Sequence, residues 1–473
     1  MSDTYRPREV EAQWRSRWEA DPPNRVDLDA VRADQKFYNL VEFPYPSAEG
    51  LHVGHVYTYC GADTFGRYQR MRGKEVYQPI GFDSFGIHTE NYALKIGERP
   101  DRLTAKTIAN YRRQLARVGA AWEWGSEVVT SDPRYYRWTQ WLFLRLFKAG
   151  LAYRAKAAVV WCPSCMTVLA NEQLEGDRCE RCGTVVTNRE MEQWFLRITS
   201  FADALLEGLD RLDWPDAAKK AQREWIGRSA GVEIDFHIEG SNAVLSAFTT
   251  RADTIFGVTF LAVPSGHLAS GSNAINPISG VHVPIIEADY VVSSYGTGVV
   301  MGVPAHDLRD RAFAVERGLP IRKVVEANEP TADGVLIDSG EFTGLDSVSA
   351  RMRIRDELEA RGAGRGATRY RLHDWLISRQ RYWGPPIPVT YCDTCGIVPV
   401  PEDQLPVLLP ETENFRPTGT GQSPLATLED WVATTCPTCS GPARRETDVS
   451  DTFLDSSWYF LRYPSSEVDD RPW

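Results

Sequence analysis

The pattern of apolar residues near the start of the chain predicts a strand, a loop and a helix in succession. Residues 37–43 form a short apolar, β-prone run, and Pro44 and Pro46 must end it because proline lacks the amide that a central strand needs. The next apolar residues recur at helical spacing, and Gly73 is a suitable stop. They are Val56, Tyr59, Cys60, Thr64, Tyr68 and Met71. Residues 47–54 are therefore expected to form a strand-to-helix loop.

This loop has the features of an anion-binding site. A loop that leads into a helix presents free backbone amides and the positive end of the helix dipole. Gly54 lets a flat ligand approach the backbone, and His52 and His55 can hydrogen-bond phosphate oxygens and stabilise charge as a pentavalent phosphorus forms. A lone His-x-Gly-His is more often structural. The preceding Phe-Pro-Tyr-Pro-Ser string at 43–47 and the strand-loop-helix context favour the functional interpretation, a site for an anion such as phosphate.

A second strand is predicted at 76–80, ending at Gly81-Phe82-Asp83. In a doubly wound sheet the carboxyl ends of the strands line the ligand crevice, so Asp83 is placed to hold a substrate ammonium. Asp83-Ser84 could instead cap a helix over 85–96, and both roles could hold. Aromatic-rich helical segments follow from 101 to 150, and their tryptophans are predicted to pack in the core. These are Trp122, Trp124, Trp138 and Trp141.

The composition is that of an ordinary globular protein. The 473 residues are 42% hydrophobic and 25% charged, and this length accommodates about three domains. No uninterrupted apolar run approaches the roughly 20 residues of a membrane helix, and the polar start at 1–5 lacks a signal-peptide core. These features predict a cytoplasmic protein. The net charge of −11 argues against a general nucleic-acid coat protein.

A local basic surface is still a candidate between residues 351 and 371. Arginines outnumber acidic residues there, and a nucleic-acid-binding surface and a solvated helix with its linker are equally good interpretations. The arginines are Arg351, Arg353, Arg355, Arg361, Arg365, Arg369 and Arg371; the acidic residues are Asp356, Glu357 and Glu359.

Eight of the nine cysteines form four Cys-x-x-Cys pairs, a metal-binding pattern in a cytosolic protein. Two such knuckles complete a tetrahedral four-sulfur site that suits zinc. A redox dithiol is the alternative, but redox pairs rarely occur four at a time. A closed four-sulfur site has no open position, so both are expected to be structural. The first set is Cys162, Cys165, Cys179 and Cys182; the second is Cys392, Cys395, Cys436 and Cys439. The solitary Cys60 is expected to be a core residue of the first helix.

Several strings in this order resemble bacterial leucyl-tRNA synthetases, members of the class I aminoacyl-tRNA synthetase family. They are Phe-Pro-Tyr-Pro-Ser at 43–47, His-Val-Gly-His at 52–55, Gly-Phe-Asp-Ser-Phe-Gly at 81–86, Glu-Asn-Tyr-Ala at 90–93, Trp-Cys-Pro-Ser-Cys at 161–165, Trp-Ile-Gly-Arg-Ser at 225–229 and Asp-Trp-Leu-Ile-Ser-Arg-Gln-Arg-Tyr-Trp-Gly at 374–384. Valyl and isoleucyl enzymes share the architecture, but this set points to leucine. The resemblance covers essentially the whole chain.

The resemblance implies ligase activity with leucine, Mg²⁺-ATP and leucine tRNA as substrates. His52 and His55 would contact ATP phosphates, with Gly54 under the adenine. The residues implied to bind leucine are Phe43, Tyr45, Asp83, Phe453, Ser456 and Tyr459, and Asp83 would hold its ammonium. An apolar pocket with one fixed carboxylate suits a branched aliphatic amino acid.

An editing domain is also implied, because one methylene is worth only about 1–3 kcal/mol of discrimination. By resemblance Thr249 and Thr250 would line the hydrolytic site, Thr254 would exclude the leucyl ester and Asp310 would hold the aminoacyl ammonium. Arg251, Val303 and Asp307 belong to the same predicted site. Without the resemblance these segments would be interpreted as a strand and a helix opening.

Three features depart from the family pattern. Ala252 replaces the usual proline in the editing loop, and Ile87-His88-Thr89 replaces the common Leu-Pro-Ala, which adds a titratable group near the crevice. The chain ends at Trp473, before the family's pocket histidine, Lys-Met-Ser-Lys-Ser loop and anticodon-binding domain. Losing one preorganised phosphate partner commonly costs roughly 10²–10³ in rate, so the chain alone is expected to be a poor ligase.

Three functional hypotheses follow. The chain is a leucyl-tRNA synthetase whose other half is a second polypeptide or lies outside this sequence, a free-standing hydrolase of mischarged tRNA, or a noncatalytic binding protein derived from the synthetase. The expected fold is α/β: a Rossmann-like class I catalytic domain with an incomplete second half, zinc-knuckle insertions and a β-rich editing domain. The expected segments are 1–155 (lead-in and first catalytic half), 156–190 (first zinc knuckle), 191–230 (connection), 231–370 (editing domain and exit linker), 371–390 (return), 391–445 (second zinc ribbon) and 446–473 (start of the second half). The surface facing the missing part is expected to be apolar and exposed.

Overall fold

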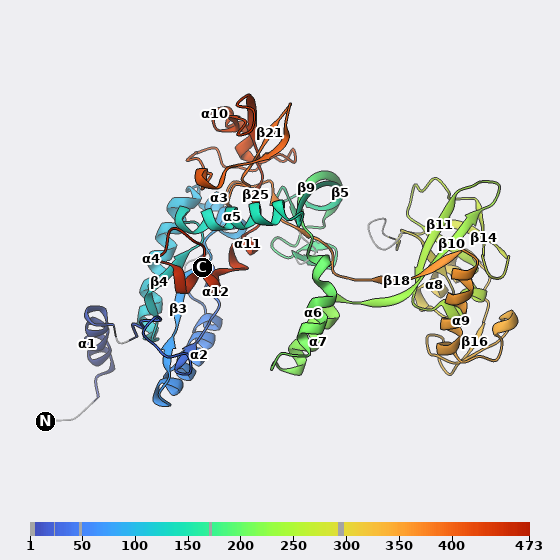
Figure 1. Cartoon of the computed structure of the whole chain (residues 1–473), viewed down its shortest axis with the longest axis horizontal. Coiled ribbons are helices and arrows are strands. Elements are labelled where there is room, and N and C mark those ends of the chain that lie inside the picture. The colour runs from blue at the N-terminus through green and yellow to red at the C-terminus, as the bar shows by residue number, and fades with distance from the viewer. Residues whose placement is uncertain (1–4, 23, 47–49, 170–172, 292–297) are drawn as a thin grey trace. The chain divides into compact units, whose positions relative to one another are not determined.

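The computed structural model describes residues 5–22, 24–46, 50–169, 173–291 and 298–473. Residues 47–49 of the predicted anion loop, and residues 295–297 of the segment at 295–310 that resembles part of the editing site, lie outside the described residues. The chain forms two compact units, one of Met1–Arg197 with Asp374–Trp473 and one of Ile198–His373. Figure 1 shows the elements of both. No helix among the described residues is both long enough and apolar enough to cross a membrane.

The first unit begins with the predicted helical lead-in, α1 (Pro7–Ala20), and continues as two parallel strand pairs. In the first pair β1 (Lys36–Tyr38) lies beside β2 (Glu75–Tyr77), and α2 (Val53–Met71) connects them. In the second pair β3 (Pro79–Phe82) lies beside β4 (Glu123–Val129), joined through α3 (Ile87–Ile96) and α4 (Pro100–Val118). Helix α5 (Pro133–Lys148) follows. The predicted strand-loop-helix order is therefore present, although the first strand is shorter than residues 37–43.

Most apolar side chains of the first predicted helix are exposed, so the prediction that Cys60 is a core residue is wrong. Tyr59 is buried against the Trp122 ring, with 5.5 Å between the centroids, but Cys60 is exposed. Other apolar side chains of α2 are exposed as well: Val53, Val56, Tyr57, Phe65, Tyr68 and Met71. The helix packs on the strands through Tyr59 and Gly66, where a Cβ would meet Gln78 and Asn39 within 2.7 Å. Nothing in the described chain covers its opposite face.

The predicted capping role of Asp83 and Ser84 is also wrong. Helix α3 begins at Ile87, its N-cap is Gly86 at φ 108°, and no side chain caps it. Asp83 is thus left for another role. Of the four tryptophans between 101 and 150, Trp122 and Trp138 are buried and Trp124 and Trp141 are partly buried, so the predicted core packing is confirmed.

The rest of the first unit is mainly antiparallel. A four-stranded sheet has the order β19-β9-β5-β6, with β5 (Ala152–Cys162), β6 (Thr167–Leu169), β9 (Thr187–Leu196) and β19 (Trp375–Leu376). The short hairpin β7 (Leu174–Glu175) and β8 (Arg178–Cys179) carries the second knuckle. A second ribbon has the order β22-β21-β24-β23, with β21 (Val389–Cys392), β22 (Gly396–Pro399), β23 (Ala433–Thr435) and β24 (Pro442–Arg445), next to α10 (Glu429–Val432). The strands β20 (Ser378–Arg379) and β25 (Val449–Ser450) pair before α11 (Thr452–Ser456) and α12 (Tyr459–Arg462).

The second unit is β-rich, as predicted. After α6 (Ala202–Leu209) and α7 (Asp216–Ile226), its main sheet has the order β11-β10-β13-β14-β12-β15, and β18 (Gly364–Arg369) pairs with β10. The strands are β10 (Ser229–Ile238), β11 (Val244–Thr249), β12 (Phe260–Val263), β13 (Asn273–Ile275), β14 (His282–Glu287) and β15 (Val300–Gly302). Helices α8 (Leu308–Arg317) and α9 (Ser347–Ala360) and the hairpin of β16 (Val325–Glu326) and β17 (Val335–Leu336) complete it.

Candidate functional site

Asp83 lies in the loop directly after β3, and its side chain is 1% exposed. Its Oδ1 accepts hydrogen bonds from the hydroxyls of Thr130 (3.2 Å) and Thr452 (2.8 Å). Its Oδ2 has no hydrogen-bond partner in the described part of the chain. Burial raises the pKa of Asp83 to about 7, against the lowering effect of the Thr452, Tyr45, Thr130 and Ser456 hydroxyls. A buried carboxylate oxygen without a partner is an acceptor prepared for a ligand donor.

Aromatic rings form an apolar wall in the same unit. The rings of Phe43 and Tyr459 are stacked, with 4.2 Å between their centroids and 15° between their planes. Tyr463 meets Phe43 edge-on at 6.4 Å. Burial and the carboxyl of Asp83 raise the pKa of Tyr45, and the hydroxyl of Tyr45 lowers the pKa of Asp83, so these two groups are neighbours. Of the predicted pocket residues, only Phe453 has a largely exposed side chain, at 37%.

The two histidines of the predicted phosphate site shape the start of α2. His52 is the N-cap, and its amide donates to Nδ1 of His55 at 3.2 Å. The two rings stack at 3.8 Å, and a Cβ on Gly54 would meet the His52 ring within 3.0 Å, so glycine makes room for the imidazole. Burial and His52 lower the pKa of His55. In the neutral ring Nδ1 is the acceptor, so Nε2 carries the hydrogen and is the group that can donate to an anion.

The return segment after residue 374 is bonded to the turn that follows Asp83 and to α3. Glu90 forms an ion pair with Arg381 at 2.8 Å, and its Oε2 accepts the amides of Tyr382 (3.2 Å) and Trp383 (2.9 Å). The indole of Trp383 donates to the carbonyl of Ser84 at 2.8 Å. Because Glu90 and Arg381 are buried, this pair fixes the first turn of α3 relative to the β20 region.

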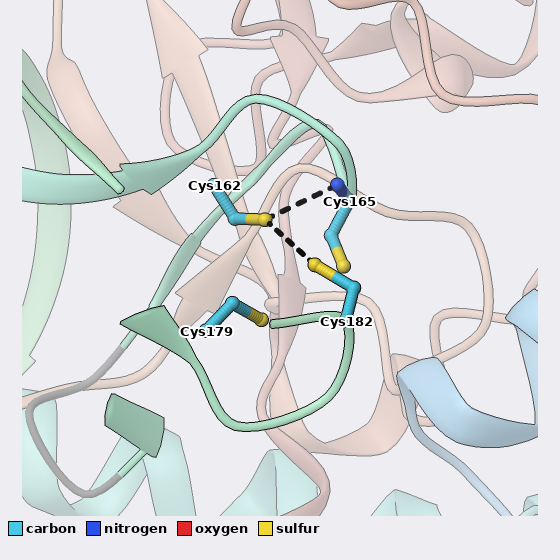
Figure 2. Close-up of side chains that lie close together, drawn as sticks. All are labelled: Cys162, Cys165, Cys179 and Cys182. Atoms are coloured by element: carbon cyan, nitrogen blue, oxygen red, sulfur yellow. Dashed lines mark hydrogen bonds between the residues drawn. The ribbon is translucent and has the colours of Figure 1, made fainter. Parts of the chain in front are cut away.

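The cysteines gather into the two predicted tetrads. Within each set the four sulfur atoms lie within 4.8 Å of one another. Figure 2 shows the first, with Cys162 and Cys165 on one knuckle facing Cys179 and Cys182 on the other; the Sγ atoms of Cys162 and Cys182 are 3.4 Å apart. In a tetrahedral site with Zn–S of about 2.3 Å the sulfurs would lie about 3.8 Å apart. Each tetrad therefore fits one tetrahedral metal ion.

In the second unit, the predicted editing residues lie around β11, β15 and the start of α8. Asp310 is 2% exposed; its Oδ2 accepts the amide of Val303 at 2.9 Å and its Oδ1 the hydroxyl of Tyr290 at 3.2 Å. Burial raises the pKa of Asp310. Asp307 caps α8 by accepting the amides of Arg309 and Asp310.

The other predicted editing residues have mainly local partners. The hydroxyl of Thr254, which is buried, donates to the carbonyl of Arg251 at 2.7 Å, and Oγ1 of Thr249 accepts the Arg251 amide at 2.9 Å. Thr250 is exposed at the end of β11. The Arg251 guanidinium pairs with Asp253 at 2.9 Å and donates to the carbonyl of Thr331 at 2.8 Å. Arg251 therefore braces the loop near residue 331.

The basic stretch between 351 and 371 is largely neutralised within the second unit. Arg365 and Arg369 both pair with Glu233, and Arg351 pairs with Asp333. Arg355 and Arg361 pair with carboxylates of their own helix. These pairs favour the interpretation of a solvated helix and linker over that of a nucleic-acid-binding surface.

Comparisons with known protein families match both units. A sequence model described as tRNA synthetases class I (I, L, M and V) matches residues 13–230, and one described as the leucyl-tRNA synthetase editing domain matches residues 223–270 and 266–359. The leucine–tRNA ligase of Caldanaerobacter subterraneus subsp. tengcongensis is 45% identical over 518 residues, which cover 100% of this chain and 63% of that protein. The leucine–tRNA ligase of Thermotoga maritima is 46% identical, covering 99% of this chain and 62% of that protein. The chain belongs to the class I tRNA synthetases.

A solved structure supports this fold. The ternary complex described as Agrobacterium radiobacter K84 agnB2 LeuRS-tRNA-LeuAMS matches 98% of this chain and 61% of that chain, with a TM-score of 0.86 and 39% identity. The predicted resemblance and the predicted fold class, a class I catalytic domain with an editing domain, are confirmed. The chain spans about 62% of the length of the curated relatives that it matches.

Some residues around Asp83 were not predicted from the sequence. Thr452 lies directly before Phe453, one of the residues predicted to bind leucine, so its position in the sequence was a signal. Thr130 follows β4 and carries no local signal. Glu90 and Arg381 were part of the matching strings, but their pairing across the sequence could not be inferred from them.

Proposed function

We propose that the chain provides the leucine-, ATP- and editing sites of a leucine–tRNA ligase. The observation that carries this is the buried Asp83 carboxylate, whose Oδ2 lacks a partner, in a unit where Phe43 and Tyr459 form a stacked apolar wall. The ammonium of leucine would bind Asp83 and its isobutyl group would pack on the rings. The similarity to leucine–tRNA ligases supports leucine as the amino acid.

The N-terminus of α2 would receive the phosphates of Mg²⁺-ATP. The leucine carboxylate would attack the α-phosphorus, forming leucyl adenylate and releasing pyrophosphate, and the adenylate would then pass its leucyl group to leucine tRNA. His55 Nε2–H would donate to phosphate oxygens as their negative charge increases. We infer that full ligation needs further parts, which a second polypeptide or the remaining length of the relatives would supply.

Leucine-dependent exchange of pyrophosphate into ATP is the test of this proposal. We expect exchange with leucine in preference to valine and isoleucine, measured for the chain alone and with a polypeptide that supplies the remaining length. No leucine-dependent exchange in either mixture would refute the proposal. The chain hydrolysing mischarged tRNA without such exchange would favour a free-standing editing enzyme instead.

His55→Leu is expected to reduce the exchange rate about 10²–10³-fold while leaving the leucine KM unchanged, because it removes the Nε2–H donor. His55→Gln is the matched control: its side-chain oxygen can still accept the N-cap amide and its amide nitrogen can still donate to phosphate, so much of the rate should remain. Exchange kinetics at varied leucine and ATP measure the effect. An equal change in leucine KM would show that the substitution disturbs the amino-acid pocket.

For the editing site, Asp310→Ala is expected to slow hydrolysis of mischarged leucine tRNA about 10- to 100-fold, because a hydrogen bond to a charged group is worth about 1.5–3 kcal/mol. Its carboxylate would hold the aminoacyl ammonium. Asp289→Asn, which removes an exposed carboxylate in the same unit, is the matched control and should not change hydrolysis. Unchanged deacylation in Asp310→Ala would remove Asp310 from the site.

Both cysteine tetrads are proposed to bind zinc, one ion each, with a purely structural role. All four thiolates of each set would be ligands, which leaves no open coordination position for a substrate. Zinc supplies folding energy to such small ribbons when it binds.

A further inference from the structure

Two carboxyl groups are buried near each other in the proposed leucine site. Asp83 is 1% and Asp455 is 0% exposed; Asp83 accepts the hydroxyl of Thr452, the first residue of α11, and Asp455 lies on the same helix. Burial raises the pKa of Asp455, and the negative charge of Asp83 raises it further. Each has one oxygen that accepts a side-chain hydroxyl and one without a hydrogen-bond partner in the described part of the chain. Neither forms an ion pair with a described residue. Ionising both carboxyl groups would cost considerable free energy, because two like charges would then be buried without a cation.

The hydrogen bonds to the two groups are unequal. Asp83 Oδ1 receives two hydroxyls, those of Thr130 and Thr452. Asp455 Oδ1 receives one, from Thr139 at 2.7 Å. Donors to a carboxylate stabilise its charged form, so the group with two donors ionises first.

The Thr130 hydroxyl has little choice of partner. Its oxygen accepts the amide of Ser84 at 2.8 Å and that of Phe85 at 3.4 Å. A hydroxyl has a single hydrogen, and with amides occupying the lone pairs that hydrogen can go to Asp83 Oδ1 at 3.2 Å or to Ser84 Oγ at 3.4 Å; the carboxylate is the nearer and the stronger acceptor.

Two features hold Thr452 in place. It opens α11, whose N-cap Asp451 forms a buried ion pair with Arg379. Gly86 leaves room for it, because a Cβ there would meet the Thr452 side chain at 3.1 Å. Its hydroxyl therefore reaches Asp83 at 2.8 Å from a fixed position.

We propose that Thr130 and Thr452 are positioning residues that make Asp83 the charged member of this pair, while Asp455 stays protonated behind it. The site then offers one negative charge to one ligand ammonium. This inference rests on the proposed function. Among the residues that the structure describes, the ionisable groups that influence Asp83 or are influenced by it are Tyr45, Tyr135, Asp455 and Tyr459, and none of these is cationic.

Leucine affinity as a function of pH tests the role of Thr452. Thr452→Val keeps the shape and removes the donor, so the acid-side loss of leucine binding should move to higher pH, with affinity about tenfold weaker near neutral pH for each unit of pKa change and recovering at higher pH. Thr452→Ser should restore the wild-type profile. A pH-independent loss of affinity in Thr452→Val would overturn the positioning role.

Infrared spectra of the unliganded chain test where the proton lies. Because burial also raises the pKa of Asp448 well above its ordinary value, the test uses difference spectra, recorded above the pKa of about 7 of Asp83. The wild-type minus Asp455→Asn spectrum should contain the carbonyl band of a buried protonated carboxyl, the wild-type minus Asp83→Asn spectrum should lack it, and Asp455→Asn should still bind leucine. Loss of leucine binding in a folded Asp455→Asn, or absence of the band from its difference spectrum, would overturn the assignment. Absence of leucine binding by wild type would instead refute the proposed function, and the infrared result would remain decisive for the proton.

Discussion

Replacing Cys162 and Cys165 together with serine is expected to remove one metal ion per chain and to unfold the first knuckle. Apparent binding energies of structural zinc are about 10–16 kcal/mol, which equals or exceeds the 5–15 kcal/mol stability of a typical domain. The strands β7 and β8 are only two residues each, so little else holds them. Metal analysis and limited proteolysis across residues 156–190 measure the change.

The loss should extend to the leucine site, because α3 rests on this knuckle. Ile87 packs among the cysteine side chains, and Arg381 joins the Cys165 carbonyl to Asn91 with two hydrogen bonds of 2.6 Å. We therefore expect leucine affinity to fall with metal content. Cys60→Ser is the matched control, since Cys60 is exposed and outside both tetrads. Full metal content in the double serine variant would show that these cysteines are not ligands.

Local patterns in the sequence predicted the features that local physics decides. The Cys-x-x-Cys spacing predicted the tetrads because a tight knuckle alone brings two thiolates together. Gly73 predicted the end of the helix, which stops at Met71, but the prolines at 44 and 46 did not mark the end of the first strand, which stops at Tyr38. The periodicity of α2 predicted a helix correctly but not its buried face, because Tyr59 and Gly66 face the strands while Cys60 does not.

Contacts between distant positions account for what the sequence did not show. Asp83 was predicted as the ammonium ligand, but its partners Thr130 and Thr452 are 47 and 369 residues away. The arginines between 351 and 371 suggested a basic surface because Glu233 and Asp333, which neutralise three of them, lie outside that stretch. His88 was expected near the crevice, and its ring accepts a hydrogen bond at 3.3 Å from Arg181 of the knuckle, which lies 93 residues away in the sequence.

Asp83→Asn is expected to abolish useful leucine binding and at the same time to stabilise the unliganded chain. Truncating one partner of a buried charge pair commonly costs about 2–5 kcal/mol, which is a loss of roughly 30- to several-thousand-fold in affinity. Calorimetric titration with leucine measures this loss. Asp289→Asn serves as the control, because the same chemical change at an exposed carboxylate should leave affinity unchanged.

The stabilisation follows from the raised pKa of Asp83. The folded pKa of about 7 lies above the ordinary 3.8, so the folded chain holds the proton more tightly and loses stability as pH rises from about 4 through 7. At 1.36 kcal/mol per unit of pKa the full loss is roughly 4 kcal/mol, and asparagine, which never ionises, avoids it. The thermal midpoints of mutant and wild type should therefore coincide near pH 4 and diverge in favour of Asp83→Asn up to a plateau above pH 7. A difference that does not depend on pH would mean that Asp83 does not titrate in this range. The charge of the buried Asp83 carboxylate would then have to be compensated by a group other than the neighbours described above.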